Sequence, residues 1–114
     1  MGAEWFEVHK PLNGRTVEEV FAEAADEARW LWGHAGYTGT IAEKVECVRV
    51  PIVVTADEAE RLVEAFARDD VGKCPDRLID VYWDFRNVAN GKWEPAVAIE
   101  VDDGSVWFVG WASS

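Results

Sequence analysis

Apolar residues recur at a helical spacing in two segments of the chain, and a capping signature precedes each segment. Thr16 and Glu19 stand three residues apart, as in a capping box, where each side chain satisfies a free backbone N–H at the start of a helix. Thr55 and Glu58 repeat this spacing. The pattern predicts one helix that starts at Val17 and stops at Gly33, and a second that follows Thr55. The expected buried stripes are Val17, Val20, Phe21, Ala24, Ala28 and Leu31 in the first helix, and Ala59, Leu62, Val63, Phe66 and Ala67 in the second.

Other segments are rich in β-branched and aromatic residues, which is typical of strands. Pro51 interrupts one of them and marks a sheet edge or a break. Asp103-Gly104 is the strongest short hairpin signal in the chain. The expected strands are EWFEVHK (4–10), VECVRVPIVV (45–54), VYWDF (81–85), PAVAIEV (95–101) and SVWFVGW (105–111).

These elements predict a single α+β domain over residues 1–114. In it, two amphipathic helices pack on one face of a mainly antiparallel β-sheet that ends in a C-terminal β-hairpin. The chain contains seven Trp, and two of them, Trp107 and Trp111, lie in the last predicted strand. We expect the tail VWFVGWASS (106–114) to supply an apolar patch through which the protein forms a homo-oligomer.

The excess of acidic residues narrows the choice of partners. The chain has 22 Asp and Glu against 11 Lys and Arg, a formal net charge of −11 at pH 7. Such a chain repels phosphate backbones, so we expect no direct nucleic-acid binding. Two explanations of the charge stay open: plain solubility, which is the commoner one, or attraction to a partner with a basic surface. No apolar run approaches the roughly 20 residues that span a bilayer, so we expect a cytoplasmic protein without membrane contact.

Catalytic and metal-binding signatures are sparse in the sequence. Cys47 and Cys74 are isolated from the two His residues, and no spacing of the zinc type occurs. A nucleophile elbow and a metalloprotease motif are also missing. We therefore expect no metal, no cofactor and no enzymatic activity, with His34 beside Tyr37 and Glu43 as the one cluster with catalytic potential.

Three glycines, Gly33, Gly36 and Gly39, follow the first predicted helix at intervals of three. Phosphate-binding loops place their glycines before a helix, where free N–H groups and the positive end of the dipole meet the phosphate, so that type of site is rejected. The segment is either a tight turn after a helix or a surface where a ligand approaches bare backbone. For the second interpretation the candidate contacts are His34, Gly36, Tyr37, Thr38, Gly39 and Thr40, with Arg29 and Lys44 as the nearest cations.

Two motifs connect the chain with a known group of proteins. GHAGYTGTIAEK (33–44) and the terminal WFVGWASS (107–114) resemble a family of small bacteriophage-encoded proteins that has no assigned activity. KWEPAVAI (92–99) departs at Glu94 from the more usual K-W-G-P-A form, which puts the shape of a turn in doubt. The resemblance implies a phage accessory protein in the cytoplasm of an infected host.

Three functions are compatible with these observations. The first is a non-enzymatic counter-defence factor, similar in action to an anti-CRISPR inhibitor, whose acidic surfaces bind and block a host defence protein; its binding would weaken with salt. The second is a sponge that sequesters a small nucleotide-like signal in a pocket at the 33–44 loop and gains thermal stability from it. The third is a small enzyme that uses His34, which would turn its ligand over rather than retain it.

Overall fold

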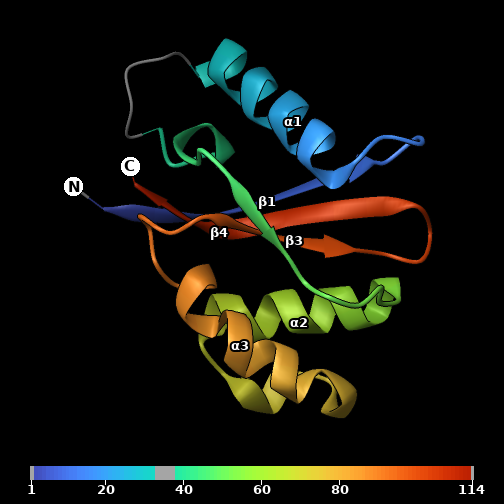
Figure 1. Cartoon of the computed structure of the whole chain (residues 1–114). Coiled ribbons are helices and arrows are strands. Elements are labelled where there is room, and N and C mark those ends of the chain that lie inside the picture. The colour runs from blue at the N-terminus through green and yellow to red at the C-terminus, as the bar shows by residue number, and fades with distance from the viewer. Residues whose placement is uncertain (1, 33–37, 114) are drawn as a thin grey trace.

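A computed structural model describes residues 2–32 and 38–113 of the chain. These residues form four strands, three α-helices and three short 3-10 helices, joined by turns and loops (Figure 1). Their order and bounds are β1 (Ala3–Pro11), α1 (Val17–Trp32), η1 (Ile41–Glu43), β2 (Cys47–Arg49), α2 (Ala56–Arg68), η2 (Val71–Lys73), η3 (Asp76–Leu78), α3 (Ile79–Ala89), β3 (Ala96–Glu100) and β4 (Ser105–Ser113).

The four strands form one sheet in the order β1-β4-β3-β2. β4 pairs with β1 and β3 in antiparallel register, and β2 runs parallel to β3. At the turn between β3 and β4, Gly104 has a φ of +87°, a left-handed conformation that glycine adopts without strain. The Asp103 carboxylate accepts the Ser105 N–H at 3.0 Å. The α+β class, the mainly antiparallel sheet and the C-terminal hairpin are thus confirmed.

The helices lie on both faces of the sheet, so the prediction that two helices share one face is wrong. Figure 1 shows α1 on one side of the sheet and α2 with α3 on the other. Alternate residues of β4 follow this division: Val106 and Phe108 pack in a core with α1, while Trp107 and Val109 pack in a core with α2 and α3. The physical reason is that β3 and β4 are apolar at consecutive positions, which requires cover on both faces.

The capping box of α1 is present as predicted. The Thr16 N–H donates to Glu19 Oε1 at 3.0 Å, and the Glu19 N–H donates to Thr16 Oγ1 at 3.1 Å. Leu31 departs from the predicted buried stripe, because it is 72% exposed, and the neighbouring Trp30 is 87% exposed. The helix therefore presents a large apolar surface near its C-terminal end.

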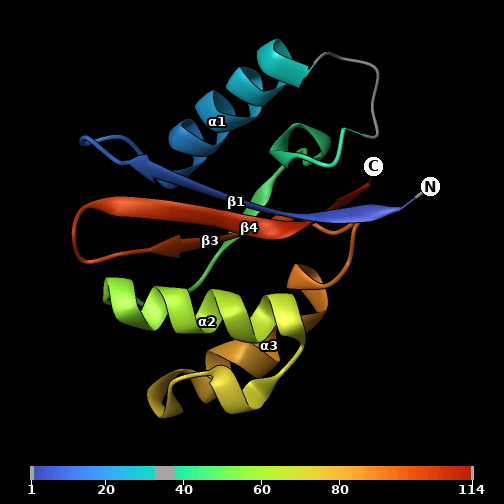
Figure 2. The ribbon, with the colours of Figure 1, turned by 180° about the vertical axis from the view of Figure 1, so that it is seen from behind.

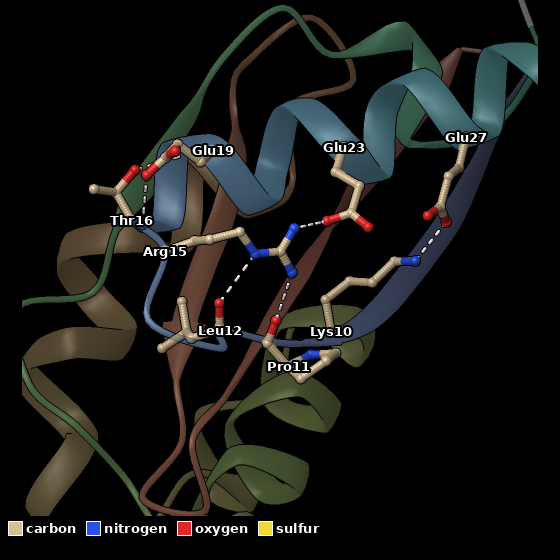
Figure 3. Close-up of polar contacts among 8 residues, drawn as sticks. All are labelled: Lys10, Pro11, Leu12, Arg15, Thr16, Glu19, Glu23 and Glu27. Atoms are coloured by element: carbon tan, nitrogen blue, oxygen red, sulfur yellow. Dashed lines mark hydrogen bonds and ion pairs between the residues drawn. The ribbon is translucent and has the colours of Figure 1, made fainter.

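Two cationic side chains join the end of β1 to the flank of α1 (Figure 3). Arg15 forms an ion pair with Glu23 and donates to the Pro11 carbonyl at 3.1 Å. Lys10 forms an ion pair with Glu27 one turn further along the helix. These contacts hold α1 alongside β1 where the chain turns from strand to helix.

The segment VYWDF is part of a helix, α3, and the predicted strand there is wrong. Leu78, Val81, Tyr82 and Ala89 are buried, and Phe85 packs against the same core. Their spacing is helical, but a window of five residues is too short to reveal it. The start of the helix also carries no side-chain cap, so the usual signal of a helix N-terminus is missing.

The predicted strand at 45–54 is shorter than expected. Cys47–Arg49 pairs with β3, and Val54 makes a single parallel bridge to Val101. Pro51 lies in the gap between them, in agreement with the prediction of a break at this proline.

The C-terminal tail is buried and does not form the predicted apolar patch. Val106, Trp107, Phe108 and Val109 all lie in the core, because β4 is an inner strand covered on both faces. The exposed large apolar side chains of the described residues are instead Trp30, Leu31, Val45, Val53, Trp83 and Trp93.

The ion pair at the start of α2 predicts a pH-dependent contribution to stability. Arg77 hydrogen-bonds the Glu58 carboxylate at 2.5 Å and 3.0 Å, and this contact, with the Thr55 N–H, lowers the pKa of Glu58 from 4.5 to about 2. We expect Glu58→Gln, which keeps a capping side chain, to lower the free energy of unfolding at pH 7 by up to about 1 kcal/mol. The folded protein keeps this carboxylate charged at a pH where the unfolded chain protonates it. The difference between the variant and the wild type should therefore shrink as the pH falls from about 4.5 to about 2.

Urea unfolding of both proteins at pH 7, 4.5 and 2 measures this difference. A difference that stays constant over the whole range would show that the Glu58 charge contributes nothing.

Candidate functional site

The second half of the glycine-rich segment forms a compact turn whose hydroxyl groups are bonded within the turn. Thr40 caps η1 by accepting the Ala42 N–H at 3.2 Å. Thr38 donates its hydroxyl to Glu43 Oε2 at 2.7 Å, and its backbone N–H donates to the same oxygen at 3.0 Å. The two threonine hydroxyls also lie 2.8 Å apart. Both side chains thus stabilise the turn, as Ser, Thr and Asp residues commonly do at such positions.

Gly39 has a structural reason to be glycine. Its φ is +72°, in the left-handed region, and the residue is buried. Its N–H donates to the Ser113 carbonyl at 2.8 Å. The turn is therefore attached to the end of β4, which brings residues 38–44 into contact with the C-terminal strand.

Lys44 is buried, with 2% of its surface exposed. Its ammonium donates to three backbone carbonyls of one turn: Glu94 at 2.7 Å, Lys92 at 3.1 Å and Gly91 at 3.4 Å. Burial lowers the pKa of Lys44, and the nearby Glu94 carboxylate opposes that effect. The three bonds use all three donors of the ammonium group, so Lys44 connects the turn after η1 to residues 91–94.

Arg29 lies on the flank of α1 that faces residues 45–47. It pairs with Asp26 at 2.9 Å and lines a groove of about 400 Å³ between α1 and residues 45–47. Cys47 also lines this groove, and burial raises the pKa of its thiol to about 11. The thiol is therefore protonated at neutral pH and is a poor nucleophile there. The structure does not bring Arg29 and Lys44 together.

Two further grooves lie along β1, one on each face of the sheet. The α1 groove, about 500 Å³, is lined by 5–10 of β1, by 39–41, and by Ala24, Glu27, Ala28 and Leu31 of α1. The α2 groove, about 460 Å³, is lined by Trp5, Glu7, Glu60, Val63, Glu64, Ala67 and Arg68. Figure 2 shows β1 running in front of β4, with α1 above it and α2 below it. Gly39 and Thr40 are the predicted site residues that reach the α1 groove.

Almost all of the positive charge is neutralised within the molecule. Of the eleven Lys and Arg side chains, Lys44 bonds to carbonyls and Lys92 lies over the Trp93 ring, with its Nζ 5.4 Å from the ring centroid. The other nine form ion pairs with Asp or Glu: Lys10–Glu27, Arg15–Glu23, Arg29–Asp26, Arg49–Glu100, Arg61–Asp57, Arg68–Glu64, Lys73–Glu64, Arg77–Glu58 and Arg86–Asp69. The charge left to interact with a partner is therefore mainly negative.

The remaining predicted contacts, His34, Gly36 and Tyr37, lie outside the described residues, as does the predicted helix stop at Gly33. The nucleotide-sponge and enzyme hypotheses depend on these residues and stay predictions. In residues 2–32 and 38–113, no group of three or more His, Cys, Asp or Glu side chains is arranged to hold a metal ion.

None of the helices in those two ranges combines the length and the apolar character needed to cross a bilayer.

Sequence reasoning missed the grooves along β1. The available signals were Pro11, a residue typical of an edge strand, and the consecutive apolar residues of 96–99 and 106–109, which indicate cover on both faces of a sheet.

Comparisons with known proteins add no further assignment. No protein-family model matches the sequence, and neither a curated protein nor a solved structure is significantly similar to it.

The Lys44 contacts generate a prediction about stability. Lys44→Met keeps the apolar stem but leaves the Lys92 and Glu94 carbonyls without the donor that the ammonium supplies. We expect the free energy of unfolding to fall by about 2–3 kcal/mol, the range for a buried polar group that loses its partner. Lys92→Met, at a half-buried position beside it, is the control and should change stability by less than about 0.5 kcal/mol. Equal effects of the two substitutions in urea unfolding would contradict a structural role for the Lys44 ammonium.

Proposed function

We propose that the protein is a non-enzymatic binding protein that docks against a basic surface of a partner protein. The observation that carries the proposal is the distribution of charge: ten of the eleven cations are ion-paired or buried and Lys92 lies over the Trp93 ring, whereas the acidic residues outnumber the cations two to one. An anionic ligand would meet few available cations in the described part of the chain, and a cationic partner would meet many carboxylates.

Carboxylates gather on the outer surfaces of the helices that cover one face of the sheet. Asp76, Asp80 and Asp84 are exposed at intervals of four along η3 and α3, next to the exposed Trp83. A charged rim beside an aromatic side chain is typical of protein–protein interfaces. On α2, Glu60 is exposed and has no ion-pair partner among the described residues.

The setting we propose is a phage infection, in which the protein blocks a host defence protein in the cytoplasm. The support for this setting is the resemblance of residues 33–44 and 107–114 to small phage-encoded proteins. Occupying a basic surface, such as a nucleic-acid groove, inhibits an effector without any chemical reaction.

Self-association belongs to the same proposal. The exposed Trp30 and Leu31 lie next to each other near the end of α1 and offer an apolar contact for a second copy.

Binding to a basic partner predicts a strong dependence on salt. We expect proteins captured from host lysate by the tagged chain to be basic, and their retention to fall at least about tenfold between 50 and 300 mM NaCl. Mass spectrometry of the eluates identifies both the proteins and any bound small molecules. Capture that is insensitive to salt, or retention of nucleotides without a protein partner, would contradict the proposal.

The self-association proposal predicts that Trp30→Ser shifts the protein toward monomer. Removing a large exposed aromatic side chain takes away the apolar area that stabilises the contact, while the core is left intact. Sedimentation velocity over a range of concentrations compares the variant with the wild type, and Trp83→Ser serves as the matched control. A wild type that stays monomeric at the highest concentration would refute self-association.

A further inference from the structure

The outer edge of β1 has backbone groups that no other strand satisfies. In a strand, the N–H and C=O of one residue point to the same side and those of the next residue point to the other. The Leu12 N–H donates to Gly104 across the sheet at 2.9 Å, so the alternate residues Phe6, Val8 and Lys10 also face β4. Trp5, Glu7 and His9 therefore direct their N–H and C=O groups away from the sheet.

The next outward carbonyl supports this assignment. Pro11 has no N–H, and its carbonyl accepts a hydrogen bond from Arg15 at 3.1 Å rather than from β4. No backbone partner for Trp5, Glu7 or His9 lies on the outer side within the described ranges. Three consecutive outward positions are thus available for pairing with an added strand.

The two grooves lie where the side chains of an added strand would project. Successive side chains of a strand point to opposite faces, so half would enter the α1 groove and half the α2 groove. In strand addition, backbone bonds supply affinity and such grooves supply specificity for alternate side chains. An unpaired strand edge with a groove on each face is the arrangement that this mode of binding requires.

The grooves differ in chemistry. The α1 groove is lined by Phe6, Val8, Ala28 and other apolar residues, and its Lys10 and Glu27 neutralise each other. The α2 groove contains three carboxylates, Glu7, Glu60 and Glu64, against one guanidinium, Arg68. Glu7 lies 2.6 Å from His9 Nε2, and Glu64 pairs with Arg68 at 3.1 Å and with Lys73 at 3.8 Å. Glu60 has no ion-pair partner among the described residues and is the carboxylate left to meet a basic side chain. One face therefore favours apolar side chains and the other favours basic ones.

A second copy of this chain fits that edge poorly. Its β1 would bring a second Glu7 to a site that already holds Glu7, Glu60 and Glu64, and like charges on neighbouring strands are destabilising. The charge of −11 on each copy adds to the repulsion.

We infer that β1 is a docking edge for an extended segment of a partner protein in which apolar and basic residues alternate. The segment extends the sheet beyond β1, places its apolar side chains against α1 and places its Lys or Arg side chains beside Glu7, Glu60 and Glu64. This inference rests on the proposed function and specifies where, and in which conformation, the basic partner binds.

The test uses a fluorescent nine-residue peptide of alternating lysine and valine, titrated with the full-length protein and followed by anisotropy. Glu60→Lys in the α2 groove should weaken binding by at least about tenfold. Asp102→Lys is the matched control, because it changes the net charge equally at an exposed position of the β3–β4 turn outside both grooves. This control variant should alter the affinity for the peptide by less than about threefold.

Equal weakening by the two variants would overturn the docking edge and leave the general attraction to basic partners intact. Absence of any binding would contradict both proposals.

Backbone pairing is tested separately from charge. Two further peptides carry N-methyl groups on backbone nitrogens, one peptide at every lysine and the other at every valine. Because backbone N–H groups alternate in direction along a strand, only one of these two sets faces β1. One peptide should lose at least about tenfold in affinity, and the other should bind within about threefold of the parent. Equal affinities would show that no strand is added.

Glu7→Pro removes an outward backbone N–H of β1 without removing a hydrogen bond to β4. Glu7→Gln is the control, because it also removes the carboxylate charge but keeps the N–H. The proline variant should bind the parent peptide at least about tenfold more weakly than the glutamine variant. Dimers that disappear in Glu7→Pro, together with absent peptide binding, would identify a second copy as the occupant and overturn the inference.

Discussion

Burial of the β3–β4 hairpin on both of its faces is the constraint that shapes the rest of the molecule. Val97, Ile99, Phe108 and Val109 have no exposed surface. Each such side chain contributes about 1.5–3 kcal/mol when it leaves water. A sheet that is apolar on both faces needs helices on both, and α1 on one side with α2 and α3 on the other supply that cover. The helices cover the faces of the sheet but leave the outer edge of β1 without a partner in the described residues.

A second constraint is the attachment of residues 38–44 to the C-terminal end of β4 and to the turn before β3. Gly39 is bonded to Ser113, and Lys44 is bonded to the turn at 91–94, so residues 38–44 are attached to two other parts of the chain. Gly110 allows close packing in the same region, because a Cβ there would lie 3.2 Å from the Phe6 ring and 3.8 Å from Lys44 Cε. The described half of the glycine-rich segment thus has a clear structural role, which accounts for its glycine, threonine and lysine residues.

The features that depend on neighbouring residues could be predicted from the sequence. The Thr16 and Thr55 capping boxes, the break at Pro51 and the hairpin at Asp103-Gly104 were all correct, because each follows from interactions over a few residues. The α3 helix was missed because it lacks a side-chain cap and because its apolar period exceeds the short window VYWDF.

Features that depend on the direction of a side chain could not be predicted in this way. Arg29 and Lys44 are close in sequence, but one lies at the surface of α1 and the other enters the end of the sheet. The docking edge depends on strand order, and the sequence alone does not reveal that β1 pairs with β4 and lies outermost. Consecutive apolar residues in 96–99 and 106–109 do indicate two covered faces, because a strand with one exposed face alternates apolar and polar residues.

The most direct test of this account is amide hydrogen exchange along β1 in the free protein, followed by NMR. The strand order and register predict slow exchange at Phe6, Val8 and Lys10, which face β4, and fast exchange at Trp5, Glu7 and His9, which face outward. This alternating pattern would establish β1 as an edge strand with free backbone groups. Equal protection at all six amides would mean that the outer edge of β1 is already paired, and it would contradict the account.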